Sequence, residues 1–472
     1  MTNYLYSGKK KKEALMRKRM KKSKQNTENK KDIIEEENIN DSKTIELTKS
    51  FGGKYDEKDK SGPIPSIFQK EPISMIEYRK YQGSVPINLK KRTELLVSKI
   101  PYDIDINPNL YHPTRQLWNY EDNKETHEKK EQDYFDNWRI NIQNEFSNDN
   151  CIIPFENNID VWRQLWRTIE QSDVIILVID IRNPLLHIPP SLIDNIVNYH
   201  KKRLIGVLTK IDLVSKDFYN KWVIFLKKNY TCFDDFLPFT KQPLDNGEDG
   251  SSGGVSSRLK RLKRKPIKND ERVEDMIQKI VEKCSIGYDL TNYKELPGTK
   301  RTASLTIGCI GHPNVGKSSL LNSIIGEKVL SVSRTAGHTK HLQHIFLNNP
   351  KGICVMDCPG LIFPMKQPRY ILELCGLFPI AQIRETLSAI DFLGSYMELE
   401  RLYALKLPEW HLDDNCKGLW SSLAICEALG EKKSYYTSKG GGAPDIHRAG
   451  LEIIKNCVDG VVCLCFYPPI NI

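Results

Sequence analysis

Apolar residues in the middle of the chain form short runs that are separated by segments of helical periodicity. The run DVIILVIDI at 173–181 is rich in β-branched residues, which is typical of a strand buried on both faces. Similar runs predict buried strands at 203–212, 304–311 and 352–360. Because strands and helices alternate, the pattern predicts a parallel sheet with right-handed crossover connections.

Amphipathic segments predict the helices that accompany these strands. In 161–172, for example, Val161, Leu165 and Ile169 recur on one helical face. Further helices are expected at 187–200, 217–230, 317–326 and 445–457. The run VVCLCFY at 461–467 predicts one last strand.

The length of 472 residues and the shifts in composition predict several domains. We expect a basic, disordered N-terminal arm at 1–60 and a mainly helical region at 61–157. An α/β domain should follow at 158–385, interrupted by a low-complexity basic insertion at 241–300. A mostly helical C-terminal domain is expected at 386–472.

Composition argues against several protein classes. The longest apolar runs, such as 174–179 and 461–467, are far shorter than the ~18 residues that a membrane span needs. The polar, basic N-terminus offers no apolar core for a secretory signal. The twelve cysteines form no Cys-x-x-Cys pair and no zinc-ligand spacing. We therefore expect reduced thiols in a cytoplasmic or nuclear protein, with the nucleolus as one nuclear location.

The net charge of +10 is concentrated in two segments. Residues 1–30 carry eleven Lys or Arg against two acidic residues, and 258–268 carry seven Lys or Arg with no acid. The rest of the chain therefore has a net charge of −6. Either these segments are simply solvated, or 9–30 and 258–268 attract RNA phosphates or direct nuclear import.

Residues 311–318, GHPNVGKS, match the phosphate-loop pattern G-x-x-x-x-G-K-[ST]. Such a loop directs backbone N–H groups at phosphate oxygens, while Lys317 reaches the β- and γ-phosphates and Ser318 binds Mg²⁺. A chance glycine-rich turn is the alternative, but a predicted strand precedes this loop and a predicted helix follows it. The sequence therefore predicts a nucleotide-binding site.

A second motif, DCPG at 357–360, follows at the end of a predicted strand. Asp357 can hold Mg²⁺ through water, and the N–H of Gly360 can meet a γ-phosphate because glycine has no side chain in the way.

The motif TKID at 209–212 selects the base. Asp212 can accept two hydrogen bonds from guanine that adenine cannot offer, and Lys210 would lie along the base plane.

A second loop, PFTK at 238–241, falls where another contact with the base is expected. A surface turn is the alternative for TKID, but the predicted strand ahead of it favours a specificity loop. An ATPase is therefore disfavoured by Asp212.

The order of these motifs resembles that of circularly permuted GTPases of the translation-factor class, because the guanine motif precedes the phosphate loop. DIRNPLLHIPPSL (180–192), SVSRTAGHTKHLQ (331–343) and VDGVVCLCFYPP (458–469) resemble the guanine nucleotide-binding protein-like 1 group within that class. The resemblance covers roughly 158–472. It implies a P-loop GTPase domain with circularly permuted motif order that binds GTP or GDP with Mg²⁺.

The resemblance also implies which residues contact the nucleotide. They are Thr209, Lys210, Ile211, Asp212, Gly311, His312, Pro313, Asn314, Val315, Gly316, Lys317, Ser318, Ser319, Asp357, Cys358, Pro359 and Gly360. Thr209 stands where the family usually has Asn, and we expect this change to loosen the contact with the phosphate loop.

Hydrolysis is expected to be slow because Leu361 follows Gly360 where many GTPases place a water-orienting Gln. Similar enzymes with a hydrophobic residue there use K⁺, which Asn314 would help to bind; the alternative is that Asn314 only favours the turn. Thr339 best matches the switch threonine that closes on Mg²⁺, with Thr335 as the alternative. The expected catalytic residues are Asn314, Lys317, Thr339 and Gly360. The expected metal ligands are Ser318, Thr339 and Asp357 for Mg²⁺ and Asn314 for K⁺.

Three functions remain open at this stage. The first is a GTP-hydrolysing switch in ribosome biogenesis, with a ribosomal subunit or rRNA as partner, as in relatives with this motif order. The second is a GTP-gated scaffold with little hydrolysis. The third is an RNA-binding protein whose GTPase domain senses the nucleotide state.

Overall fold

The computed structural model describes most of the chain from residue 73 onward. The described residues are 73–87, 111–117, 123–146, 155–241, 271–296, 302–326, 329–330, 342–347, 351–365, 367–408, 419–437 and 442–469. The predicted N-terminal arm and the basic segments 9–30 and 258–268 lie outside these residues, as do Thr339 and its alternative Thr335.

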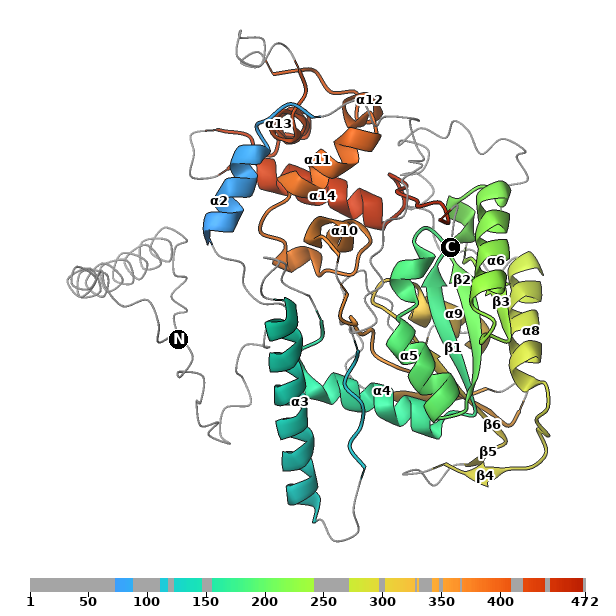
Figure 1. Cartoon of the computed structure of the whole chain (residues 1–472). Coiled ribbons are helices and arrows are strands. Elements are labelled where there is room, and N and C mark those ends of the chain that lie inside the picture. Colours follow the sequence, from blue (N-terminus) through green and yellow to red (C-terminus); the bar gives the residue numbers. More distant parts are fainter. Residues whose placement is uncertain are drawn as a thin grey trace, which may run out of the picture. The chain divides into compact units, whose positions relative to one another are not determined.

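A six-stranded sheet forms the centre of the α/β domain (Figure 1). The strand order is β3-β2-β1-β6-β8-β7, and every neighbouring pair is parallel except β7 with β8. The strands are β1 Val174–Asp180, β2 Arg203–Thr209, β3 Asp235–Pro238, β6 Leu305–Ile310, β7 Gln343–Phe346 and β8 Ile353–Asp357. The predicted parallel sheet is confirmed, and β3 and β7 extend it beyond the four strands that the sequence predicts.

Helices cover both faces of this sheet. They are α4 Ile159–Gln171, α5 Pro190–Asp194, α6 Lys216–Asn229, α8 Glu271–Ser285 and α9 Lys317–Ile325. A turn of π-helix, Asn195–Tyr199, continues α5, so the predicted helix at 187–200 consists of two short pieces.

Alternate residues of β1 face two separate cores, which explains why this strand is apolar on both sides. Ile175 and Leu177 pack in one buried cluster with residues of α4 and α6. Ile176 and Val178 pack in a second cluster with residues of α8 and α9. Each such side chain contributes roughly 1.5–3 kcal/mol by leaving water, so burial on both faces fixes β1 in the middle layer.

α8 corrects the predicted extent of the insertion. We expected low-complexity sequence across 241–300, but α8 places Val273, Ile280 and Cys284 in the core with the sheet. The short antiparallel strands β4 Lys294–Glu295 and β5 Thr302–Ala303 follow it. The prediction is wrong for 271–296 because the apolar face of α8 is interspersed with charged residues.

A second group of helices shares its own buried core. These helices are α10 Arg369–Leu374, α11 Leu387–Tyr396, α12 Leu399–Leu402, α13 Ser422–Lys432 and α14 Ile446–Val458. Leu372 of α10, Ile390 of α11 and Ile453 of α14 are among the buried residues of that core. We call these five helices the C-terminal helical region.

The described helices of the predicted region 61–157 pack against different cores. α2 Ile73–Gln82 leads to Ile87, which is buried in the core of the C-terminal helical region. α3 Lys124–Phe146 instead buries Trp138, whose ring meets that of Trp162 in α4 at 5.9 Å. These described helices therefore belong to cores built by later parts of the chain.

The predicted last strand at 461–467 is wrong. This segment is buried but joins no sheet. It is held at single points: Phe466 N donates to Arg182 O at 2.9 Å, and Trp222 Nε1 donates to Phe466 O at 2.9 Å. The apolar run instead enters two cores, with Cys463 and Cys465 in that of the α/β domain and Leu464 in that of the C-terminal helical region.

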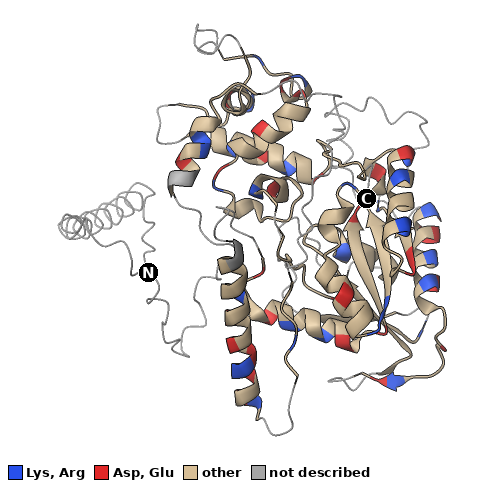
Figure 2. Cartoon of the chain, in the orientation of Figure 1, with Lys and Arg blue, Asp and Glu red and all other residues tan. Residues whose placement is uncertain are grey.

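Charged residues lie mainly on the outer helices (Figure 2). α3 and α8 carry both signs, and pairs such as Lys279 with Asp275 at 2.6 Å join successive turns. These helices thus provide no stripe of a single sign. Within the described part of the chain, no helix is both long and apolar enough to span a membrane.

Candidate functional site

The predicted motifs meet at one edge of the sheet. From β1 the chain adds β2 and β3 on one side, whereas β6 and β8 lie on the other side. In open parallel sheets, ligands bind outside the carboxyl ends of the strands where the strand order reverses in this way. At that edge Thr209 ends β2, Gly311 follows β6 and Asp357 ends β8. The structure therefore brings the three permuted motifs together.

The phosphate loop connects β6 to α9 and has an unusual backbone. Gly311, Asn314 and Gly316 all have positive φ angles, of 146°, 58° and 105°. A β-carbon on Gly311 would lie 2.8 Å from the Val178 carbonyl oxygen, so only glycine fits against β1. Left-handed residues in such a loop turn successive N–H groups towards one point, which suits a phosphate.

Lys317 begins α9 and is folded back onto the loop. Its Nζ donates to the His312 carbonyl oxygen at 2.6 Å, and its side chain is buried. Burial lowers the pKa of Lys317, whereas the nearby Asp357 carboxylate raises it. The ammonium group thus lies inside the loop that would receive the phosphates.

Asp357 has an unsatisfied buried carboxylate. Neither of its oxygens makes a hydrogen bond among the described residues, and burial raises its pKa to about 6. The Lys317 ammonium and the Ser318 hydroxyl lie close enough to oppose this shift. A carboxylate and a hydroxyl are the hard oxygen donors that Mg²⁺ prefers, so Asp357 and Ser318 fit this cation.

Gly360 lies directly against the phosphate loop. A β-carbon there would lie 2.9 Å from the Pro313 Cα and 3.0 Å from Lys317 Nζ. Glycine is therefore required if the backbone after β8 is to approach the loop this closely. Leu361, the next residue, is buried in the core of the α/β domain.

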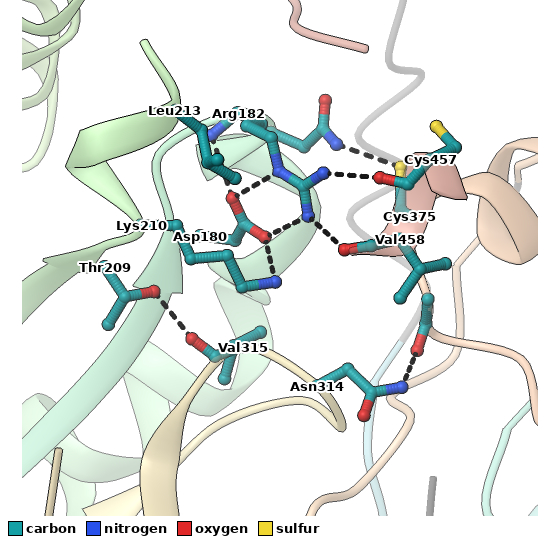
Figure 3. A network of polar contacts seen from close by, with 12 residues as sticks. Asp180, Arg182, Thr209, Lys210, Leu213, Asn314, Val315, Cys375, Cys457 and Val458 are labelled. Atoms are coloured by element: carbon teal, nitrogen blue, oxygen red, sulfur yellow. Dashed lines mark hydrogen bonds and ion pairs between the residues drawn. The ribbon is translucent and has the colours of Figure 1, made fainter. Parts of the chain in front are cut away.

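Thr209 keeps its contact with the phosphate loop. Its hydroxyl donates to the Val315 carbonyl oxygen at 2.6 Å (Figure 3). Thr209 thus reaches the phosphate loop from the end of β2 although Thr replaces the usual Asn.

Asp212 is positioned by a residue from the end of β3. The Thr240 hydroxyl donates to Asp212 Oδ1 at 2.7 Å. Burial raises the pKa of Asp212, and the hydrogen bond from Thr240 opposes that shift. The predicted loop 238–241 therefore lies beside the guanine motif and holds its carboxylate.

Lys210 has a left-handed backbone, with φ at 58°. Its ammonium group pairs with Asp180 Oδ2 at 2.7 Å (Figure 3). Asp180 is paired in turn with Arg182, whose Nη2 lies 2.8 Å from the same oxygen. Sequence reasoning missed this acidic and basic pair, although charged residues directly after a buried strand at this edge are a usable signal.

The remaining predicted residues differ in their surroundings. Ile211 packs partly buried against the core, and Pro359 is buried beside Gly360. Cys358 is fully buried, which raises its pKa to about 12 and leaves it as an inert thiol. Ser319 is half-buried on the first turn of α9.

His312 of the phosphate loop meets His187 edge to face, with ring centroids 5.4 Å apart. Burial lowers the pKa of His187 to about 4 and that of His312 well below its usual value. Both rings are therefore neutral near pH 7, and His312 adds no positive charge to the phosphate site.

Comparisons with known proteins show which proteins this chain is similar to. A family model described as 50S ribosome-binding GTPase matches residues 306–386. GTPase LSG1-1 of Arabidopsis thaliana is 28% identical over 390 residues, which cover 76% of this chain and 68% of that protein. The GDP-bound structure of TM YlqF is similar at 19% identity with a TM-score of 0.34, covering 66% of this chain and all of that one.

Guanine nucleotide-binding protein-like 1 of Mus musculus is 32% identical over 447 residues, covering 85% of this chain and 72% of that protein. The Homo sapiens protein of the same name is 32% identical over 446 residues. The motif order, the parallel sheet and these identities agree. The chain therefore belongs to the guanine nucleotide-binding protein-like 1 family of circularly permuted GTPases.

Proposed function

We propose that this protein hydrolyses GTP to GDP and phosphate as a conformational switch during ribosome biogenesis. One observation carries the proposal: a phosphate loop and a guanine-reading carboxylate, Asp212, lie at the same edge of one sheet. The description of the matching family as 50S ribosome-binding GTPase supports the ribosomal part.

Each motif has a distinct task in this reaction. Lys317 leaves the His312 carbonyl to neutralise the β- and γ-phosphates, and the Gly360 N–H meets the γ-phosphate. Asp357 and Ser318 hold Mg²⁺, which supplies positive charge to the phosphates when bound. Asp212, held by Thr240, accepts the two guanine hydrogen bonds.

Intrinsic hydrolysis is slow in this proposal because Leu361 occupies the place of a water-orienting side chain. Asn314 would hold K⁺ through its amide oxygen, and the ion would supply positive charge for the phosphates when bound. The Asn314 Nδ2 is engaged with the Gly376 carbonyl at 2.8 Å, which fixes the amide in one orientation.

The test of this cation role compares steady-state GTP hydrolysis in K⁺ and Na⁺ at equal ionic strength. We expect faster turnover in K⁺, and we expect Asn314→Ala to remove the difference. Equal rates in both salts, or a K⁺ effect that persists in Asn314→Ala, would reject the role.

Co-sedimentation of the full chain with purified ribosomal subunits tests the proposed function. We expect binding with a GTP analogue, weaker binding with GDP, and loss of this difference in Lys317→Ala. Nucleotide-independent binding that falls steeply with salt and disappears when residues 1–30 are deleted would instead indicate the RNA-binding alternative.

A further inference from the structure

We propose that Asp180 is a positioning residue of the guanine site and that the C-terminal helical region completes this site through Arg182. Asp180 holds Lys210 beside the base, and Arg182 holds Asp180 while bonding to the end of α14. The inference rests on the guanine-nucleotide binding proposed above. It predicts that guanine affinity depends on α14 although α14 carries none of the nucleotide motifs.

The first step concerns Asp180 at the end of β1. Its side chain is only 2% exposed, and Oδ1 accepts hydrogen bonds from the N and the Nε of Arg182, both at 3.1 Å. Oδ2 is 2.8 Å from Arg182 Nη2 and 2.7 Å from Lys210 Nζ. Burial alone would raise the pKa of Asp180, but the charges of Arg182 and Lys210 hold it well below the usual range. Asp180 is therefore a permanent negative charge shared by two cations.

The second step concerns Lys210. Two other residues of the motif are held by separate partners. The Thr209 hydroxyl donates to the Val315 carbonyl oxygen, and Asp212 accepts from the Thr240 hydroxyl. The ion pair with Asp180 fixes the end of the side chain between them. A lysine whose ammonium group is anchored loses much of its rotamer freedom before the ligand arrives, so its aliphatic part is ready to cover the base.

The third step connects this pair to the C-terminal helical region (Figure 3). Arg182 Nη1 donates to the Cys457 carbonyl oxygen at 2.8 Å, and Nη2 donates to the Val458 carbonyl oxygen at 3.3 Å. These are the last two residues of α14; Cys457 O also accepts from Gly460 N at 3.1 Å, and Arg182 adds a side-chain donor to this helix end. The negative end of the helix dipole also favours a cation there.

The burial of Arg182 makes the two sets of contacts interdependent. Its side chain is 2% exposed, and a buried guanidinium is tolerated only when its donors are satisfied. If the α14 carbonyls move away, Arg182 must reorganise, and the carboxylate that anchors Lys210 moves with it. A purely structural ion pair would stabilise the fold without affecting guanine affinity.

A double-mutant cycle on the full chain separates these two roles. Asp180→Asn and Lys210→Met are combined, and the Kd for GDP and the melting temperature are measured for each variant. We expect Asp180→Asn to weaken GDP binding about tenfold in the wild-type background. In the Lys210→Met background we expect no further loss of GDP affinity, although the melting temperature still falls.

Unchanged GDP affinity in Asp180→Asn, or an equal loss of affinity in both backgrounds, would overturn the inference. If Asp180→Asn does not fold, Arg182→Lys takes its place in the same comparison. We expect Arg182→Lys to weaken GDP binding three- to tenfold when Lys210 is present and to have no effect on GDP affinity in the Lys210→Met background. Failure of the wild type to bind GDP would contradict the proposed function itself. This outcome is distinct from failure of the Asp180 inference, in which the wild type binds GDP but Asp180→Asn has no effect.

The matched control is Asp234→Asn. Asp234 pairs with Arg203 at 2.7 Å, and Arg203 begins β2 at the opposite end from Thr209. This pair also joins a carboxylate to an arginine beside β2, but it lies away from the nucleotide edge. We expect Asp234→Asn to leave the Kd for GDP unchanged.

Discussion

Several buried polar side chains near the phosphate loop make no hydrogen bond within the described part of the chain. The Asp357 carboxylate and the ring nitrogens of His187 and His312 make no hydrogen bond among the described residues. Each such group reduces the stability of the nucleotide-free protein, because its transfer from water is not compensated. Such a cost is expected where a bound ligand, and not the fold, supplies the missing partners.

Asp357→Asn should stabilise the nucleotide-free protein. Burial raises the pKa of Asp357 from 3.8 to about 6. Above pH 6 the ionised carboxylate therefore lowers the free energy of unfolding by about 3 kcal/mol. The cost grows as pH rises from 3.8 to about 6, so the gain from Asn at pH 5 should be about half that at pH 8. Denaturant unfolding without Mg²⁺ at both pH values measures it. A destabilised Asp357→Asn protein at pH 8 would contradict this account of the carboxylate.

Asp212→Asn should change the base that is preferred. Asn retains an oxygen that can accept from Thr240, so the fold is preserved, but its amide now offers a donor to the 2-oxo group of xanthine. We expect GDP to bind at least about a hundredfold more weakly and xanthosine diphosphate (XDP) to bind more tightly. Thr240→Val is the control, because it should weaken GDP binding without strengthening the binding of XDP. Unaltered base selectivity in Asp212→Asn would remove Asp212 from the base site.

The elements that the sequence predicts correctly are those with a strong local signal. β1, β2, β6 and β8 are apolar on both faces, and α9 is followed by Gly326 with the positive φ of 79° that such a terminus favours. Motif residues at the ends of these strands could therefore be placed from sequence alone.

Elements that depend on distant partners could not be placed in this way. β3 and β7 have four residues each, too few to show a period. The segment 461–467 has the composition of a strand, but it joins neither sheet and its side chains fill two cores. The contact of Arg182 with α14 could not be predicted either, because it is made to the backbone carbonyls of Cys457 and Val458, much later in the chain.

The turn after β8 approaches the phosphate loop so closely that a side chain at Gly360 should disturb it. In Gly360→Ala, the added carbon would lie 2.9 Å from Pro313 Cα, so the turn or the phosphate loop must shift. We expect GTP hydrolysis to fall about a hundredfold, with a smaller change in GDP affinity, because the N–H no longer reaches the γ-phosphate. Single-turnover rates and equilibrium titration measure the two effects.

Gly326→Ala is the control for Gly360→Ala. Gly326 has a positive φ, but no atom lies within 4 Å of the position of its β-carbon. This substitution should cost about 1 kcal/mol of stability from backbone strain and leave hydrolysis intact. An equal loss of hydrolysis in both variants would indicate that the effect of Gly360→Ala is only a loss of stability.

At the scale of the whole described chain, several hydrogen bonds join the nucleotide motifs to the C-terminal helical region. Arg182 binds the end of α14, and Asn314 in the phosphate loop donates to Gly376, which follows α10. Arg369, the first residue of α10, follows Gly360 by nine residues. We therefore expect the C-terminal helical region to respond to the bound nucleotide.

Hydrogen exchange measured with GDP and with a GTP analogue tests that response. We expect the amides of α10 and of the end of α14 to differ in protection between the two states, whereas α13 changes less. Asn314→Ala should reduce the difference at α10, because it removes the hydrogen bond to Gly376. Identical exchange throughout the C-terminal helical region in both states would contradict nucleotide coupling.

If the permuted motifs form a single site, the protein should hydrolyse GTP without a partner. Single-turnover hydrolysis, with enzyme in excess over GTP and Mg²⁺ present, tests it most directly. We predict a first-order conversion of GTP to equal amounts of GDP and phosphate, and its loss in Lys317→Ala while the fold is retained. Absence of conversion by the wild type under these conditions, or an undiminished rate in Lys317→Ala, would contradict the account.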